Sequence, residues 1–185
     1  MKQLAVVLTL LGLLPSLAHA AEFNRVQADR SSIAFSFSQM GVPMEGRFAK
    51  FASQLSFDPA APAQAQVTIE VDLASIDTGT PELDTEAAGR PWFNIKAFPV
   101  ARFTSTAVTP GAGNRYTVEG SLSIKGKTRD IVVPAHFSAQ GNTGTFAGRF
   151  TLRRGDFSIG EGPWSAFDIV ANDVEVTFRL VALSQ

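Results

Sequence analysis

Five acidic residues gather in one short stretch of the chain, and their side chains are the first candidates for chemistry. Asp72, Asp77, Glu82, Asp84 and Glu86 lie within residues 72–86. Two carboxylates about 5 to 10 Å apart can hydrolyse a glycosidic bond, and clustered carboxylates can bind calcium. Their spacing matches no calcium-binding loop. Acids are also expected at the start of a short helix because of its dipole, and we favour that interpretation.

A Gly-Lys-Thr sequence at 126–128, with Gly120 upstream, resembles part of a phosphate-binding loop. Such a loop has four residues between its glycines and joins a strand to a helix. Here five residues separate the glycines, and the segments on both sides alternate as strands do. The sequence therefore argues against a phosphate-binding loop.

Histidine and cysteine usage excludes most other catalytic devices. The chain has no cysteine, so disulfides, thiolate metal sites and cysteine nucleophiles are excluded. Of the two histidines, His19 lies in the N-terminal segment and His136 is in phase with the polar face of its strand. A solvated histidine is the better interpretation of His136. We expect no catalytic residues, no metal site and no enzyme activity.

The N-terminal residues have the features of an export signal. Lys2 supplies the positive charge, residues 4–14 form an apolar run, and Ala18 and Ala20 fit the small-x-small cleavage pattern. The run is shorter than the roughly 20 apolar residues that span a membrane. We predict cleavage after Ala20, a single domain at 21–185, and a periplasmic or secreted location. The net charge of −1 offers no electrostatic case for binding nucleic acid.

Apolar and polar residues alternate through residues 116–137 on both sides of a polar turn. Tyr116, Val118, Leu122 and Ile124 share one face of the first arm. This period-two pattern predicts a long β-hairpin. Similar segments occur at 23–27, 31–39, 46–57, 66–76, 101–108, 145–153 and 169–183, and together they predict about eight antiparallel strands.

Two local signals interrupt the strands. The spacing from Phe48 to Phe51 breaks the alternation, which predicts a bulge within 46–57. Thr80 as N-cap, Pro81 at the first position and Gly89 at the end predict one short helix. An all-β chain of this kind forms a sandwich or closes on itself, and long strands favour a barrel.

Phenylalanine is in large excess, with fifteen Phe against two Trp and one Tyr. Its side chain has no polar atom, so it suits an apolar interior. Any one of these residues is explained as ordinary core. As a set, however, seven of them fall at positions that should face inward on different strands, and together they would line an apolar tunnel: Phe35, Phe37, Phe48, Phe57, Phe103, Phe146 and Phe150.

Five blocks of the sequence, in order, resemble the YceI family of bacterial lipid-binding, lipocalin-like proteins. They are Ser-Ile-Ala-Phe-Ser-Phe at 32–37 through Gly-Arg-Phe-Ala-Lys-Phe at 46–51; Leu-Ser-Phe-Asp-Pro at 55–59; Phe-Asn-Ile-Lys-Ala-Phe-Pro-Val-Ala-Arg-Phe-Thr-Ser at 93–105; Gly-Ser-Leu-Ser-Ile-Lys-Gly-Lys-Thr at 120–128; and Arg-Gly-Asp-Phe-Ser-Ile-Gly at 154–160 with Asn-Asp-Val-Glu-Val at 172–176. The resemblance implies an eight-stranded antiparallel lipocalin-like barrel with one or two short helices around a long apolar pocket. It also implies exported, often dimeric carriers of polyisoprenoids such as prenyl pyrophosphates or quinones.

Two features qualify the resemblance. Many members carry histidine just before the second strand and again near its end, where this chain has Ser31 and Gln39. A head-group role for those histidines therefore cannot be carried over. The stretch 160–164 resembles a subgroup that is attached to membrane cytochrome b domains, which implies a respiratory membrane partner.

We therefore expect a non-catalytic protein that holds an isoprenoid or quinone-type chain inside the barrel and has no other cofactor. The expected tail pocket is Phe35, Phe37, Phe48, Phe57, Val71, Phe103, Leu122, Phe146 and Phe150. The expected mouth is Trp92, Phe93 and Phe98, with Lys96 and Arg102 as nearby cations for an anionic head group, although ordinary surface charge also explains those two. The alternatives are a carboxylate-based hydrolase of the cell envelope and an interaction module whose barrel is filled by its own side chains.

Overall fold

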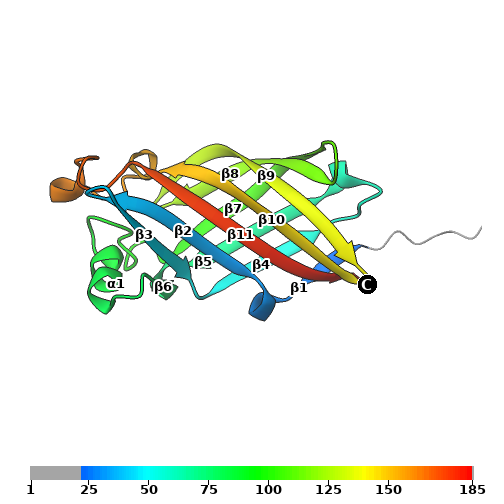
Figure 1. Cartoon of the computed structure of the whole chain (residues 1–185), viewed down its shortest axis with the longest axis horizontal. Helices are drawn as coiled ribbons and strands as arrows, with labels where there is room; N and C mark the ends of the chain where they lie inside the picture. Colours follow the sequence, from blue (N-terminus) through cyan, green and yellow to red (C-terminus); the bar gives the residue numbers. More distant parts are fainter. Residues whose placement is uncertain (1–21, 185) are drawn as a thin grey trace, which may run out of the picture.

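The computed structural model describes residues 22–184, so the predicted export signal and its cleavage site lie outside the described residues. Within that range the chain forms one antiparallel sheet of eleven strands (Figure 1). The strands are β1 (Phe23–Val26), β2 (Ser32–Gln39), β3 (Val42–Phe48), β4 (Phe51–Ser56), β5 (Gln66–Asp72), β6 (Ile76–Asp77), β7 (Val100–Pro110), β8 (Arg115–Ile124), β9 (Lys127–Gln140), β10 (Thr143–Arg153) and β11 (Asp173–Ser184).

Helical structure is sparse in the described residues. One α-helix, α1, spans Pro81–Ala88. The 3-10 turns are η1 (Ala28–Arg30), η2 (Pro62–Gln64), η3 (Leu73–Ser75), η4 (Arg154–Phe157) and η5 (Gly162–Trp164). None of the helices within residues 22–184 combines the length and the hydropathy that a membrane crossing requires.

The sheet is strongly curled into a half-barrel. Its neighbours follow the order β4-β5-β7-β8-β9-β10-β11-β2-β3-β6, with β1 paired to β11. β3 leads directly into β4, so the chain itself connects one end of this order to the strand next to its other end. The strands therefore wrap around one interior (Figure 1).

The predicted central hairpin is confirmed as β8 and β9. The two strands pair from Arg115 opposite His136 to Ile124 opposite Lys127. Lys125 and Gly126 form the connection, and both have positive φ (50° and 73°), as a tight two-residue hairpin turn requires. The Gly-Lys-Thr sequence thus joins two strands, which is not the setting of a phosphate-binding loop.

The single strand predicted at 46–57 is wrong, because the chain changes partners there. β3 pairs with β2, and β4 pairs with β5. Between them the backbone N–H of Ala49 donates to the carbonyl of Ser75, and the N–H of Lys50 to its hydroxyl (both 2.9 Å). The break falls where a bulge was expected. The predicted segment 66–76 likewise divides into β5 and β6, and these two divisions raise the strand count to eleven.

The predicted helix is confirmed as α1, with Thr80 as N-cap and Gly89 as C-cap. The Thr80 side chain makes no capping hydrogen bond. Instead, the Asp84 carboxylate accepts from both the backbone N–H and the hydroxyl of Thr78 (2.8 and 2.7 Å). An acid in the first turn of the helix thereby holds the loop that precedes it.

The two ends of the molecule differ (Figure 1). One end carries α1, the segment 89–99 and the loop 154–172, and we call it the capped end. At the opposite end lie β1 and the C-terminus of β11. There the side chains of Phe23, Phe57, Tyr116, Phe137 and Phe146 pack together, and we call it the aromatic end.

Candidate functional site

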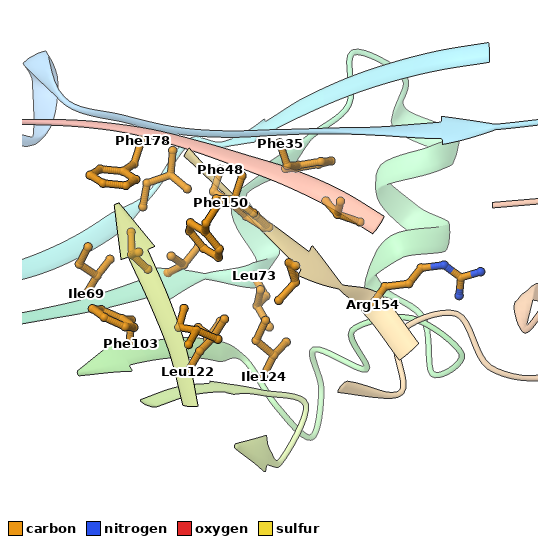
Figure 2. Close-up of a pocket in the computed structure, with 18 of the residues that line it drawn as sticks. Phe35, Phe48, Ile69, Leu73, Phe103, Leu122, Ile124, Phe150, Arg154 and Phe178 are labelled. Atoms are coloured by element: carbon orange, nitrogen blue, oxygen red, sulfur yellow. The ribbon is translucent and has the colours of Figure 1, made fainter. Parts of the chain in front are cut away.

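A cavity of about 300 Å³ runs inside the curled sheet. This volume falls at the lower end of the range of about 300 to 1,000 Å³ that is typical of small-molecule pockets. Its walls are the inward faces of the strands, and α1 contributes Leu83, Glu86 and Ala87 at the capped end. Figure 2 shows Phe35, Phe103, Phe150 and Phe178 around the cavity, contributed by different strands.

All nine residues of the expected tail pocket line this cavity. Alternation explains the result, because every second residue of a strand faces the same side of the sheet. On β2, for example, Ile33, Phe35 and Phe37 all line the cavity. The full set is Phe35, Phe37, Phe48, Phe57, Val71, Phe103, Leu122, Phe146 and Phe150.

Three of the inward phenylalanine rings lie over glycines of neighbouring strands. Phe35 pairs with Gly46 and Phe178 with Gly148, while the Phe103 ring covers Gly120. A Cβ atom at any of these glycines would come under 3.0 Å from the ring. Because the backbone beneath is bare, each ring packs close to the wall. The interior can therefore be rich in phenylalanine and still keep an open centre.

The aromatic end is closed by ring packing. Phe57 contacts Tyr116, Phe137 and Phe146 with ring centroids 5.3, 4.8 and 5.0 Å apart. Phe23 adds an edge-to-face contact with Phe137 at 5.1 Å. Such geometries are the preferred ones for aromatic pairs. Phe23 and Phe57 are only 2% and 3% exposed, so packed aromatic side chains fill this end.

The capped end supplies most of the polar lining. Gln39, at the end of β2, faces the cavity in phase with Phe35 and Phe37, and no hydrogen bond joins its carboxamide to another described residue. The Glu86 carboxylate of α1 accepts a hydrogen bond of 2.9 Å from the indole N–H of Trp164. Thr78, Trp92, Arg154 and Trp164 also line the cavity at this end.

Arg154 organises the loop 154–172. Its side chain is 2% exposed and donates to six backbone carbonyls at 2.7 to 3.5 Å, with no carboxylate partner among the described residues. Burial lowers the pKa of its guanidinium. The carbonyls belong to Ile159, Gly160, Trp164, Ala166, Val170 and Ala171. Since a guanidinium has five N–H groups, all its donors are engaged. In Figure 2 it points away from the apolar residues of the cavity.

Lys125 fastens the capped end to the β8–β9 turn. Its side chain is 7% exposed, and its Nζ donates to the carbonyls of Pro91 (3.2 Å) and Ser158 (2.7 Å). A third bond of 2.9 Å reaches the carboxylate of Glu161. That hydrogen bond holds the pKa of Glu161 below its ordinary value of 4.5. One cation thus joins the segment 89–99, the loop 154–172 and the hairpin.

The residues expected at the mouth divide into two groups. Trp92 and Phe93 line the cavity. Phe98 instead lies against Gly126, and Lys96 is exposed to solvent. Arg102 points outward because its neighbours on β7 face inward, and it forms an ion pair with Glu70 on the outer surface. The structure therefore brings neither of these two cations to the cavity.

The acidic residues of the helix region hold local structure. Asp72 accepts from the N–H of Ala74 (3.0 Å), and a hydrogen bond from Arg47 lowers the pKa of Asp77. Of the five acids only Glu86 lines the cavity, so no carboxylate pair faces it. Within residues 22–184, no group of three His, Cys, Asp or Glu side chains is placed to hold a metal ion. His136 is exposed, as the alternation indicated.

Sequence reasoning missed many lining residues as site residues, among them Gln39, Glu86, Arg154 and Phe178. Phe178 alternates in phase with Val174 and Val176 on β11, and Gln39 does so with the inward residues of β2. The alternation pattern could therefore have predicted that both face the cavity. Glu86 follows Leu83 by one helical turn. No sequence signal predicted that Arg154 would be buried.

Comparison with known proteins gives curated relatives along most of the chain. A UPF0312 protein of Vibrio cholerae is 30% identical over 164 residues, covering 84% of this chain and 87% of that protein. A UPF0312 protein of Shewanella baltica is 32% identical over 156 residues, covering 80% and 81%.

Solved structures show the same architecture. The crystal structure of Burkholderia cenocepacia BcnA matches with a TM-score of 0.83 and 41% identity over 85% of this chain and 99% of that chain. A Saccharophagus degradans domain described as polyisoprenoid binding matches in fold, with a TM-score of 0.67 and 17% identity over 90% of this chain and 100% of that one. Residues 25–182 match the YceI-like domain, and this chain therefore belongs to the YceI family.

Proposed function

We propose that this protein binds a long apolar lipid of the isoprenoid or quinone type inside its cavity and does not act on it chemically. The observation that carries the proposal is the continuous apolar wall between the aromatic end and the capped end. Each methylene buried there would contribute roughly 0.8 kcal/mol. The fold likeness to a domain described as polyisoprenoid binding supports the same ligand class.

The two alternatives from the sequence have less support. A barrel filled by its own side chains would not leave a cavity of about 300 Å³. A carboxylate-based hydrolase needs two carboxylates at one cleft, and only Glu86 of the acidic group lines this cavity. We therefore keep lipid binding as the single proposal.

Mass spectrometry of an organic extract tests the proposal directly. The protein is purified from the cells that naturally produce it, and the extract is compared with that of an unrelated protein handled identically. A stoichiometric isoprenoid or quinone is the expected result. Absence of lipid, together with failure to bind added prenyl chains, would overturn the proposal.

A charge inside the cavity should abolish lipid retention. We expect Phe150→Asp to release the lipid, because an unpaired carboxylate in an apolar site is costly and pulls in water. Val132→Asp is the matched control, since Val132 is 60% exposed. Far-UV circular dichroism establishes that both variants fold. Equal lipid content in the two folded variants would contradict the cavity assignment.

Export with cleavage after Ala20 stays a prediction, as do a homodimer and a respiratory membrane partner. The intact mass of protein recovered from the cell envelope fraction checks the cleavage. Sedimentation of the lipid-loaded protein checks the dimer.

A further inference from the structure

A second hollow lies on the outer surface of the sheet. Its volume is about 260 Å³, and its walls are η2, the start of β5 and the middle of β7. Thr68 and Thr104 belong to it, and both alternate with residues that line the inner cavity, so they face outward. At about 30 Å³ per water molecule, the hollow holds about eight waters. It therefore has room for a compact polar group and not for a long lipid tail.

A bulge in β7 shapes one wall of this hollow. The pairing of β7 with β8 shifts its register between Ser105 and Ala107. The pairing of β7 with β5 ends at Thr104, opposite Thr68. Beyond that pair, the Ser105 hydroxyl accepts a hydrogen bond of 2.9 Å from the backbone N–H of Val67, and this bond fixes the spacing of the two strands. Bulges are over-represented next to active sites, where they re-aim side chains.

The opposite wall, η2, is held by its own backbone. It begins with Pro62, whose ring fixes the backbone angle φ. The backbone N–H of Gln64 donates to the carbonyl of Ala61 (3.0 Å), and that of Ala65 donates to the carbonyl of Pro62 (3.1 Å). A ligand would thus meet walls that are already ordered, and it would lose little affinity to the ordering of a loop.

The lining offers hydrogen bonds from uncharged side chains only. Nine residues line the hollow, and none of them is ionisable. Within residues 22–184, the one side-chain hydrogen bond among these nine is that of Ser105. Two methyl groups, those of Ala63 and Ala65, add a small apolar surface. The carboxamides and hydroxyls that stay uncommitted can each donate and accept; they belong to Gln64, Gln66, Thr68, Thr104 and Thr106.

The charged groups around the hollow already have partners. The next outward pair along β5 and β7 is Glu70 opposite Arg102, and these two side chains form an ion pair. On the β8 side, Asp130 accepts a hydrogen bond of 2.7 Å from the hydroxyl of Ser121. A charged ligand would lose hydration here without gaining an uncommitted group of opposite charge. The site therefore favours an uncharged ligand that is rich in hydrogen-bonding groups.

We propose that this outer hollow binds one unit of a neutral saccharide. A sugar ring carries hydroxyl groups that donate and accept, and its C–H groups suit the two alanine methyls. The site is separate from the inner cavity, although segment 65–67 lines both. The proposal goes beyond lipid binding, because it gives the protein a glycan ligand outside the sheet in addition to a lipid inside it.

Amide chemical shifts of the isotopically labelled, lipid-loaded chain test the proposal. The neutral probes are maltotetraose, cellotetraose and chitotetraose, and tetragalacturonate is the charged counterpart. We expect a neutral probe to shift the amides of Gln66 and of residues 104–106, with a dissociation constant of about 1 mM, the strength of about four hydrogen bonds. Tetragalacturonate should bind about tenfold more weakly or less.

Two results would overturn the proposal. One is that no neutral probe shifts these amides at about ten times that concentration, or that the shifts are confined to other surfaces. The other is that tetragalacturonate binds as tightly as the neutral probes, which would exclude selection of an uncharged ligand.

Thr104→Val tests the hydroxyl groups, with Thr117→Val as its matched control. Both changes keep the side-chain shape and a β-branched residue, and Thr117 is exposed on β8 outside the hollow. We expect Thr104→Val to weaken saccharide binding about three- to tenfold, the equivalent of one hydrogen bond. Thr117→Val should leave it unchanged, and equal affinity of the two variants would exclude this hollow. Lipid content, measured by mass spectrometry of an organic extract, should match the parent in both, which separates this test from that of lipid binding.

Discussion

The two ends of the cavity are built on different physical principles. The aromatic end consists of packed rings, whose contacts are numerous, individually weak and only mildly directional. The capped end consists of irregular backbone held by two cations, Arg154 and Lys125, through directional hydrogen bonds. The first design excludes water and resists opening. The second can rearrange when a few bonds change, so we expect the lipid to enter at the capped end.

The largest expected effect is at Arg154. Arg154→Met keeps the length of the side chain but removes five donors. Six carbonyls then lose the guanidinium, although that of Ala166 still accepts from the backbone N–H of Val170. We expect stability to fall by about 3 to 5 kcal/mol, because each buried acceptor left without a donor costs about 1 to 3 kcal/mol and several are affected at once. Urea unfolding measures the loss, and hydrogen exchange should show the loop 154–172 opening first.

Arg149→Met serves as the control, because Arg149 lies on β10, the strand that leads directly into Arg154, with its side chain 73% exposed. Its substitution should change stability by about 0.5 kcal/mol or less. If the Arg154 variant were as stable as this control, the capped end would not depend on the guanidinium.

The next effect belongs to the aromatic end. Phe57→Ala removes a ring that three other rings contact, and large-to-small changes of this kind cost about 3 kcal/mol or more. Phe167→Ala at the capped end should cost much less, since Phe167 is 51% exposed. Thermal unfolding compares the two variants. Equal losses would mean that the Phe57 ring contributes no more to stability than the half-exposed Phe167 ring at the capped end.

The smallest effect concerns pH. Because Lys125 lowers the pKa of Glu161 in the folded protein, the ionised carboxylate stabilises the fold above the ordinary pKa of 4.5. That contribution is lost as the pH falls below 4.5 through the folded-state pKa. Glu161→Gln should therefore be less stable than the parent at pH 7, and the difference should shrink as the pH falls below 4.5. A difference that is independent of pH would assign the effect to packing.

Alternation predicted most of this fold and the cavity wall. The hairpin of β8 and β9, helix α1 and the nine tail residues all follow from periods and caps that a sequence displays. The break between Phe48 and Phe51 was located, but the exchange of partner strands was not, because it depends on the distant Ser75. Arg154 could not be predicted, since its partners are backbone carbonyls, which every residue possesses.

The glycines beneath the phenylalanine rings imply that the width of the cavity depends on residues of the wall behind those rings. Gly46, Gly120 and Gly148 occupy positions covered by a ring. A methyl group at Gly46 would push the ring of Phe35 toward the axis and lie 3.1 Å from the carbonyl oxygen of Asp77, whereas at the other two it would come under 3.0 Å from a backbone oxygen. Relatives with identical inward side chains could thus accept tails of different width through a single substitution at one of these glycines. The glycines set the width of the cavity, and the inward side chains set its chemistry. Either property can therefore change without the other.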